Sequence, residues 1–420
     1  MHQHIVQRLR EGLDTQGVAG IVLSTVDNVT YSTGFESVMD GWRLPEPISA
    51  VFIPTSPELP MTLFLPEASL IGLVVAARAG QAVAFDRLRT FDLLNFCATG
   101  RAEDVHLALA PDLMAELEQL FSLVDEDCSQ NIVLSVAGCL RNLGLTGQTV
   151  MFDDMRLALN TEQACGQHYA DGLDMMMALR AIKTPAEITV FRESGEKADR
   201  VMQHTVGELG TGRTWEDIEK SVAHFMIDEG IDPLPNSPML FGGSYDAIFK
   251  PDLFRTRFDT PFRGGEIAIL ETQGRYKNIW IDINRTAHIG KASAQYREQH
   301  AIVQRCFEEV VQNLRPGANT AEICEPVRCG TARELDAPGK LLMIVHSIGR
   351  VPLESPVRYP STGLHAATEG FEIKPWMVLS FDCLYFGSKY GPSHMENVFV
   401  IGEDRTESIY SYPLDLIETD

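Results

Sequence analysis

The sequence predicts an α+β protein of two domains, in which a smaller α/β layer precedes helices packed on a mostly antiparallel sheet. Three observations support this prediction. The chain has 420 residues, a length that favours two or three domains over one. Its first third alternates helical and strand-like segments, as an α/β layer does. After Pro233 the pattern changes to β-rich runs and helical segments return later, which is typical of an α+β layer.

The elements of the first third follow from its apolar pattern. Residues 1–15 have the spacing of a short amphipathic helix, and the run VAGIVLS at 18–24 indicates a buried strand. Residues 50–54 and 61–64 are predicted to be further strands, because the Pro-rich turn TSPELP separates them.

Helix-start signals mark the middle of the chain. In LRAIKTPAEI, at 179–188, Thr184 is an N-cap, a proline takes the first helical position and Glu187 completes a capping box. A second cap, at Thr214, predicts another helix that ends near residue 228. We expect domains at 1–165 and 166–420, with the boundary between 160 and 185.

The second half combines strands and helices. Gly and Asn mark the turns between its β-rich runs, and RPGANT separates two helical runs, with Thr320 as the expected cap of the second. The predicted strands include 267–271, 279–283 and 398–401, and the predicted helices include 294–314 and 320–335.

Charge and composition limit the partners. The 58 acidic and 35 basic side chains give a net charge of −23, which disfavours nucleic acid and anionic membranes as partners. The first residues contain no apolar signal core, and the apolar stretches are too short to span a bilayer. The eight cysteines form no CxxC pair. We therefore expect a soluble, cytoplasmic protein with reduced thiols.

Five ionisable residues lie inside β-rich runs, where a lone buried charge is costly. Glu271 and Asp282 stand eleven residues apart across a predicted hairpin, so both can lie on one face. Asp382 and Glu396 repeat this arrangement, and His346 lies between the two pairs. If they converge, four carboxylates and one imidazole suit one or two divalent ions such as Mn, Fe, Co or Zn.

The order of motifs over residues 180–414 resembles a known family. It is the creatinase, aminopeptidase P and methionine aminopeptidase family (metallopeptidase family M24), whose catalytic domain has the pita-bread fold. YSTGF at 31–35 suits the creatinase-type N-terminal domain. The resemblance thus implies a pita-bread catalytic domain preceded by a smaller α/β creatinase-type domain. The motifs are RAIKTPAEI, LETQGRYKNIWIDINRT, LRPGANTAEI, HSIGRVPLESP, WMVLSFDC and HMENVFVI.

The resemblance also implies metal ligands. The five metal positions of the family fall on Glu271, Asp282, His346, Asp382 and Glu396, where the usual set is Asp, Asp, His, Glu and Glu. The first position therefore has Glu for Asp and the fourth has Asp for Glu. Each exchange alters the reach of the side chain by one methylene, roughly 1.5 Å.

Two histidines that are customary in the peptidases of this family are replaced or missing. Seven residues after His346 stands Leu353, followed by Glu354, and no His occurs between residues 224 and 288. His365 and His394 lie near the predicted site in sequence and could act instead. The candidate catalytic residues are therefore His346, Glu354, His365 and His394.

Three functions are compatible with these residues. The first is a homodimeric, metal-dependent hydrolase in which water attacks a C–N bond of a small substrate or a proline-containing peptide. The second is a metal-independent enzyme, a hydrolase resembling creatinase or ectoine hydrolase or a lyase, in which His346 shuttles a proton and Arg43 and Arg358 bind a substrate carboxylate. The third is a non-catalytic binding module, which has no need of so many buried charges.

Overall fold

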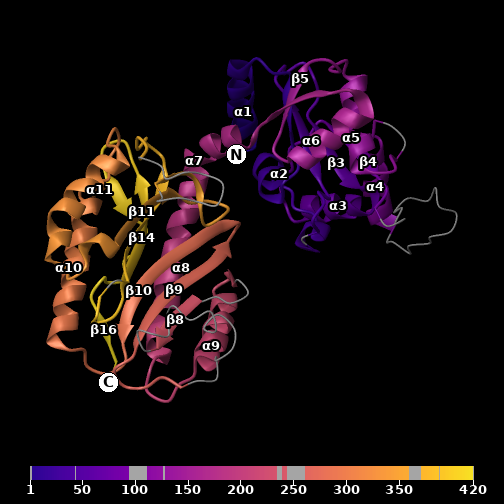
Figure 1. Ribbon diagram of the computed structural model, residues 1–420. Helices are drawn as coiled ribbons and strands as arrows, with labels where there is room; N and C mark the ends of the chain where they lie inside the picture. Colours follow the sequence, from indigo (N-terminus) through magenta and orange to yellow (C-terminus); the bar gives the residue numbers. More distant parts are fainter. Residues whose placement is uncertain are drawn as a thin grey trace. The chain divides into compact units, whose positions relative to one another are not determined.

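The structure, a computed structural model, shows two compact units, Met1–Leu179 and Arg180–Asp420. Each unit packs helices on a sheet of its own (Figure 1). The residues that the structure describes are 2–42, 44–93, 111–125, 128–233, 239–243, 261–358, 370–386 and 388–419.

The N-terminal unit is built on a mixed sheet with the strand order β4-β3-β2-β1-β5-β6. β1 pairs antiparallel with β2 and parallel with β5. Its strands are β1 (Gly20–Leu23), β2 (Ala50–Pro54), β3 (Thr62–Pro66), β4 (Arg87–Phe91), β5 (Thr149–Phe152) and β6 (His168–Asp171). Its helices are α1 (His2–Gln16), α2 (Val26–Thr33), α3 (Leu70–Arg78), α4 (Pro111–Phe121), α5 (Ile132–Asn142) and α6 (Met155–Cys165), with α7 (Leu173–Ala181) at the junction of the units.

The predicted elements of the first third are confirmed. The helix expected at 1–15 is α1, and the three apolar runs form β1, β2 and β3. Every residue of these three strands is buried. Because both faces of the strands are covered, they appear in the sequence as continuous apolar runs rather than as alternating ones.

The C-terminal unit is built on a larger sheet with the strand order β12-β11-β13-β14-β10-β9-β7, which is antiparallel along this path. β8, β15 and β16 extend it by pairing with β9, β14 and β10. Its strands are β7 (Asp232–Pro233), β8 (Met239–Gly243), β9 (Ile267–Tyr276), β10 (Ile279–His288), β11 (Leu341–Ser347), β12 (Glu354–Arg358), β13 (Val378–Tyr385), β14 (Ser393–Ile401), β15 (Thr406–Ser408) and β16 (Ile417–Glu418). Its helices are α8 (Pro185–Glu208), α9 (Trp215–Asp228), α10 (Ala294–Val311) and α11 (Thr320–Cys329).

Two helix pairs pack on one side of this sheet (Figure 1). α8 and α9 contribute to one core with Ile281 and Ile283 of β10, and α10 and α11 contribute to another with Phe381 and Cys383 of β13. Successive side chains of a strand point to opposite faces. The residues between these apolar ones therefore point away from the helices, and they include the predicted acidic ligands. The predicted α+β class is confirmed.

The helix caps agree with the sequence signals at two places and differ at a third. Thr184 and Glu187 form the predicted capping box of α8, and the Thr214 hydroxyl accepts from the Asp217 amide at the start of α9. The prediction that Thr320 caps α11 is wrong, because Asn319 is the cap and the buried Thr320 hydroxyl instead accepts from the Phe371 amide. The predicted helix at 320–335 is also too long: α11 stops at Cys329, before Gly330, and a short 3-10 turn follows.

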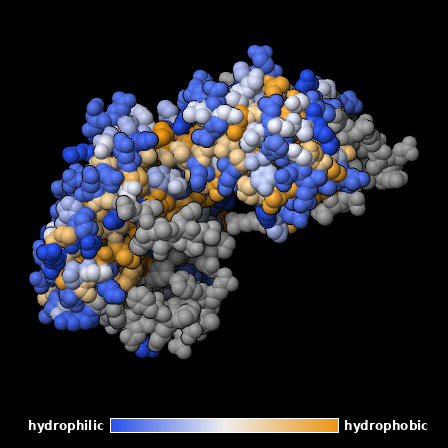
Figure 2. Space-filling model, turned by 45° about the horizontal axis from the view of Figure 1, so that its top comes forward, coloured by the Kyte–Doolittle hydropathy of each residue, from blue (hydrophilic) through white to orange (hydrophobic). Residues whose placement is uncertain are grey.

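Hydrophilic side chains line much of the outer margin of the face drawn in Figure 2. Among the residues that the structure describes, no helix combines the length and the apolar character needed to cross a bilayer.

Candidate active site

The hairpin of β9 and β10 places four polar side chains on one face. Its two-residue turn, Lys277–Asn278, has positive φ at both positions, as hairpins of this length favour, and the turn fixes the register. In this register Glu271 pairs with Asn284, and Gln273 pairs with Asp282. The prediction that an eleven-residue separation puts Glu271 and Asp282 on one face therefore agrees with the observed pairing.

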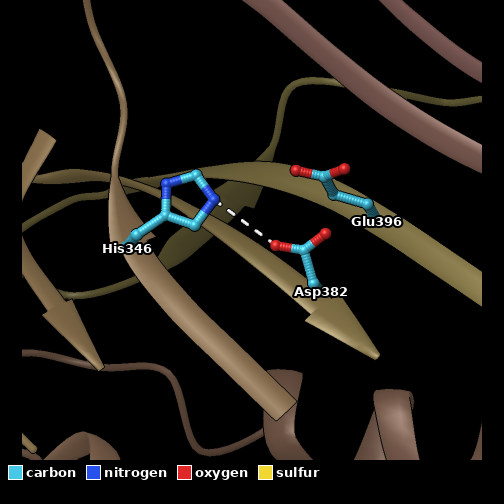
Figure 3. Close-up of side chains that lie close together, drawn as sticks. All are labelled: His346, Asp382 and Glu396. Atoms are coloured by element: carbon cyan, nitrogen blue, oxygen red, sulfur yellow. Dashed lines mark ion pairs between the residues drawn. The ribbon is translucent and has the colours of Figure 1, made fainter. Parts of the chain in front are cut away.

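A second group lies on β11, β13 and β14. Asp382 and Glu396 are direct cross-strand partners, and His346 pairs with Ser380, two residues before Asp382. The imidazole of His346 and the carboxylates of Asp382 and Glu396 point toward one another (Figure 3). Each offers one ligand atom, and these atoms all lie within 4.8 Å of one another in a buried setting.

The two groups meet where β10 lies beside β14, because Asn284 is paired with Glu396. Burial raises the pKa of Asp282 well above its ordinary value, and the charges of Glu271 and Asp382 raise it further. The structure thus brings all five predicted ligands to one side of five adjacent strands.

The two histidines that face Asp382 differ in their hydrogen bonding. Nδ1 of His346 lies 3.0 Å from the carbonyl oxygen of Ser347, which can only accept, so Nδ1 carries the proton. Nε2 of His346 lies 3.4 Å from Oδ2 of Asp382. Nε2 of His394 lies 3.0 Å from Oδ1 of Asp382 and donates to it. Both imidazoles thus face the Asp382 carboxylate, and His394 orients it through the shorter contact.

Three neutral side chains support the carboxylates, and the sequence prediction missed them. Ser380 donates to Oε1 of Glu396 at 2.5 Å, and Asn284 donates to Oε2 of Glu271 at 3.3 Å. Gln273 lies between Glu271 and Asp282. Each of the three stands two residues from an acid on its own strand, so the two-residue period of a strand was a signal that could have found them.

Burial and mutual repulsion govern ionisation of the carboxylates. Burial raises the pKa of Glu396 well above its ordinary value, and the charges of Asp282 and Asp382 raise it further. Burial, together with the charge of Asp382, raises the pKa of Glu271 to about 7, although the charge of His394 opposes this rise. Burial also acts to raise the pKa of Asp382, but hydrogen bonds from His346 and His394 outweigh it and hold this pKa below its ordinary value. Four carboxylates buried together can stay ionised only if a positive charge lies beside them.

The donor set fits a divalent ion. One imidazole and two carboxylates are ligands that Mn, Fe, Co and Zn accept. The proton on Nδ1 of His346 is held by a backbone carbonyl, which is the usual outer-shell arrangement of a metal-binding histidine. In addition, Oδ1 of the fully buried Asn284, beside Glu271, has no hydrogen-bond partner among the residues that the structure describes.

Two further predicted site residues, Glu354 and Arg358, are not brought to this cluster. Glu354 is fully buried, and its carboxylate accepts from Arg180 and from Lys183, whose Nζ is 3.3 Å away. Arg358 pairs with Val345, which puts both on the face opposite to His346, and its guanidinium donates to the carbonyl of Met343 at 2.6 Å. Both therefore have structural partners of their own. Arg43 and His365 lie outside the described residues.

The buried imidazole and carboxylates lie on the face of the antiparallel sheet that points away from the helices, an arrangement typical of the catalytic domains with the pita-bread fold. A family model described as metallopeptidase family M24 matches residues 189–403, so the chain belongs to this family. The resemblance found in the motifs is thereby confirmed. Membership of this metallopeptidase family indicates a hydrolase that acts on C–N bonds.

Named relatives are distant. The chain is 26% identical over 165 residues to ectoine hydrolase of Halomonas elongata, which covers 37% of this chain and 40% of that relative. It is 23% identical over 244 residues to the uncharacterized peptidase YqhT of Bacillus subtilis, which covers 57% of this chain and 65% of that relative. The matches thus span about two fifths to two thirds of the length of these relatives.

The solved structures show the same fold over the whole chain. The Xaa-Pro dipeptidase from Bacillus anthracis has a TM-score of 0.71 at 17% identity, and the alignment covers 100% of both chains. The predicted combination of a pita-bread domain with an N-terminal domain is therefore confirmed.

Proposed function

We propose that the protein is a metal-dependent hydrolase in which water attacks a C–N bond of a proline-containing peptide or a related small substrate. The observation that carries the proposal is the buried convergence of His346, Asp382 and Glu396, whose ligand atoms lie within 4.8 Å of one another. The likeness to family M24 supports the choice of reaction.

The side chains of the cluster have two roles in this proposal, because some would hold the metal ion and others orient its ligands. A divalent ion held by His346, Asp382 and Glu396 would supply Lewis acidity toward the scissile carbonyl and make water more acidic. His394 holds Asp382 in position through a 3.0 Å hydrogen bond, and Ser380 does the same for Glu396. Because these supporting groups sit on rigid strands, the carboxylates are oriented before substrate arrives.

The substrate is proposed from chemistry and from the relatives together. The Bacillus anthracis structure is an Xaa-Pro dipeptidase, and the Halomonas protein is an ectoine hydrolase, so both kinds of substrate belong in the first screen. We also propose that the protein acts as a homodimer in the cytoplasm, as expected from the sequence.

Metal binding should tighten as pH rises. Burial and the neighbouring acids raise the pKa of Glu396 well above its ordinary value, so at low pH a proton competes with the ion. Below that pKa the apparent affinity should increase by up to about tenfold per pH unit for each proton released. Calorimetric titration with Mn²⁺ between pH 5.5 and 7.5 measures this, and an affinity that does not change with pH would contradict it.

The proposal is tested by removing and restoring the metal. The full-length protein is purified without chelator, its metal content is measured, and turnover of Xaa-Pro dipeptides and ectoine-type substrates is followed before and after chelation. We expect chelation to abolish turnover and Mn²⁺, Fe²⁺, Co²⁺ or Zn²⁺ to restore it. A protein that is free of metal and fully active would overturn the proposal.

A metal-independent hydrolase is the second candidate, and one observation favours it. Leu353, at the position where the related peptidases have a second histidine, is 47% exposed and cannot transfer a proton. In that case chelation leaves activity intact while His346→Ala removes it, because His346 would be the proton shuttle.

A further inference from the structure

We infer that this chain binds a single metal ion through His346, Asp382 and Glu396, and that the Gln273 amide fills the place of a second cation between Glu271 and Asp282. The inference rests on the proposed function, because it assigns the number of ions at that same site. If it holds, Glu271 and Asp282 do not bind a metal ion directly, although the family has ligands at both positions.

The position of the amide nitrogen carries the inference. Nε2 of Gln273 lies 2.7 Å from Oε1 of Glu271, and 3.2 and 3.3 Å from Oδ1 and Oδ2 of Asp282. An ion bound to both carboxylates would need oxygen distances of about 2.0–2.2 Å. Such an ion would have to lie in the space between these oxygens, which the amide nitrogen already occupies.

The carboxylate oxygens are also satisfied without an ion. The two N–H bonds of the Gln273 amide are shared among three oxygens, Oε1 of Glu271 and both oxygens of Asp282, and the fourth oxygen, Oε2 of Glu271, accepts from Asn284 at 3.3 Å. These neutral donors give the two buried acids hydrogen-bond partners.

The other half of the cluster is arranged differently. There Nδ1 of His346 is held by the Ser347 carbonyl, and Nε2 faces Oδ2 of Asp382 at 3.4 Å. One ligand atom each of His346, Asp382 and Glu396 lie within 4.8 Å of one another, so one cation can contact all three, whereas an amide donor already lies between Glu271 and Asp282. We therefore assign the ion to His346, Asp382 and Glu396. At Glu271 and Asp282 the amide of Gln273 provides hydrogen bonds instead.

The strand register keeps Gln273 in place. Gln273 is the direct cross-strand partner of Asp282 and stands two residues after Glu271 on the same face of β9. Residues paired in this way have adjacent side chains, so the amide reaches both acids without a rearrangement of the backbone.

Metal stoichiometry tests the inference without relying on activity. The metal-depleted full-length protein is titrated with Mn²⁺, and bound ions are counted by calorimetry and elemental analysis. Electron paramagnetic resonance distinguishes an isolated Mn²⁺ ion from a spin-coupled pair. We expect one ion per chain with the spectrum of an isolated ion, and in Gln273→Ala we expect two ions with the spectrum of a coupled pair.

Control variants distinguish a failure of this inference from a failure of the proposed function. Gln304→Ala, on the exposed face of α10, should behave as the unchanged protein does. If Gln273→Ala does not fold, the isosteric Gln273→Glu, which loses the amide donor, should also bind a second ion. Two ions in the unchanged protein, or one in a folded Gln273 variant, would overturn the inference and leave metal dependence standing. A fully active protein that binds no ion would overturn both.

Discussion

Replacing Asp382 with asparagine should abolish metal binding and lower kcat/KM by about a thousandfold. Asp382 is the one acid of the site that both imidazoles contact, at 3.4 Å from His346 and 3.0 Å from His394. Asparagine has nearly the same shape but no negative charge, so it is a poor ligand for a divalent ion. Loss of Lewis-acid assistance costs several kcal/mol of transition-state stabilisation, and about 4 kcal/mol corresponds to roughly a thousandfold in rate.

Elemental analysis and steady-state kinetics measure this effect. Asp404→Asn, at an exposed position after β14, is the matched control and should leave metal content and turnover unchanged. Unfolding curves of both variants show whether the fold is retained. An Asp382→Asn variant that keeps its metal and its activity would rule out Asp382 as a ligand.

Replacing Arg285 with alanine should destabilise the C-terminal unit by about 3–5 kcal/mol, because a large buried side chain and its hydrogen bonds are lost. Arg285 is fully buried, and burial lowers its pKa to about 10. Its guanidinium donates to the carbonyls of Pro413, Tyr412, Asn284 and Glu396 and to the side chain of Asn397, over distances of 2.6–2.8 Å.

The alanine variant would leave these acceptors without a partner and open a large cavity. Urea unfolding measures the loss of stability. The control is Arg297→Ala, because Arg297 is 48% exposed and pairs with Glu418 on the surface, where an ion pair contributes about 0–1 kcal/mol. Equal stabilities of the two variants would contradict the structural role of Arg285.

The site could be predicted from the sequence to the extent that strand alternation determines it. Glu271 and Asp282 share a face because the two-residue turn at Lys277–Asn278 makes their spacing fit one hairpin register. Asp382 and Glu396 pair for the same reason on β13 and β14. Each of the four strands carries a single acid within a β-rich run, and this pattern allows both pairs to be predicted.

The positions of Arg358 and Glu354 could not be predicted from the sequence, because they depend on contacts between distant parts of the chain. Arg358 lies only twelve residues after His346, but its pairing with Val345 turns it to the other face. Glu354 is held by Arg180 and Lys183, more than 170 residues earlier in the chain. No local sequence pattern predicts hydrogen-bond partners that are so distant in the chain.

Neutral residues were missed for a different reason. A glutamine in a strand has no distinctive sequence pattern. The role of Gln273 can be recognised only in the structure, where its amide lies between two carboxylates. Thr320 is predicted to be a helix cap because threonine is a common cap, but its hydroxyl accepts a hydrogen bond from the Phe371 amide.

Anomalous diffraction at the Mn absorption edge, from crystals of the full-length protein grown with Mn²⁺, tests the central claim most directly. We predict one peak, at about 2.0–2.2 Å from Nε2 of His346 and from carboxylate oxygens of Asp382 and Glu396. A protein that turns over its substrate while the crystals show no peak at these three residues would contradict the account.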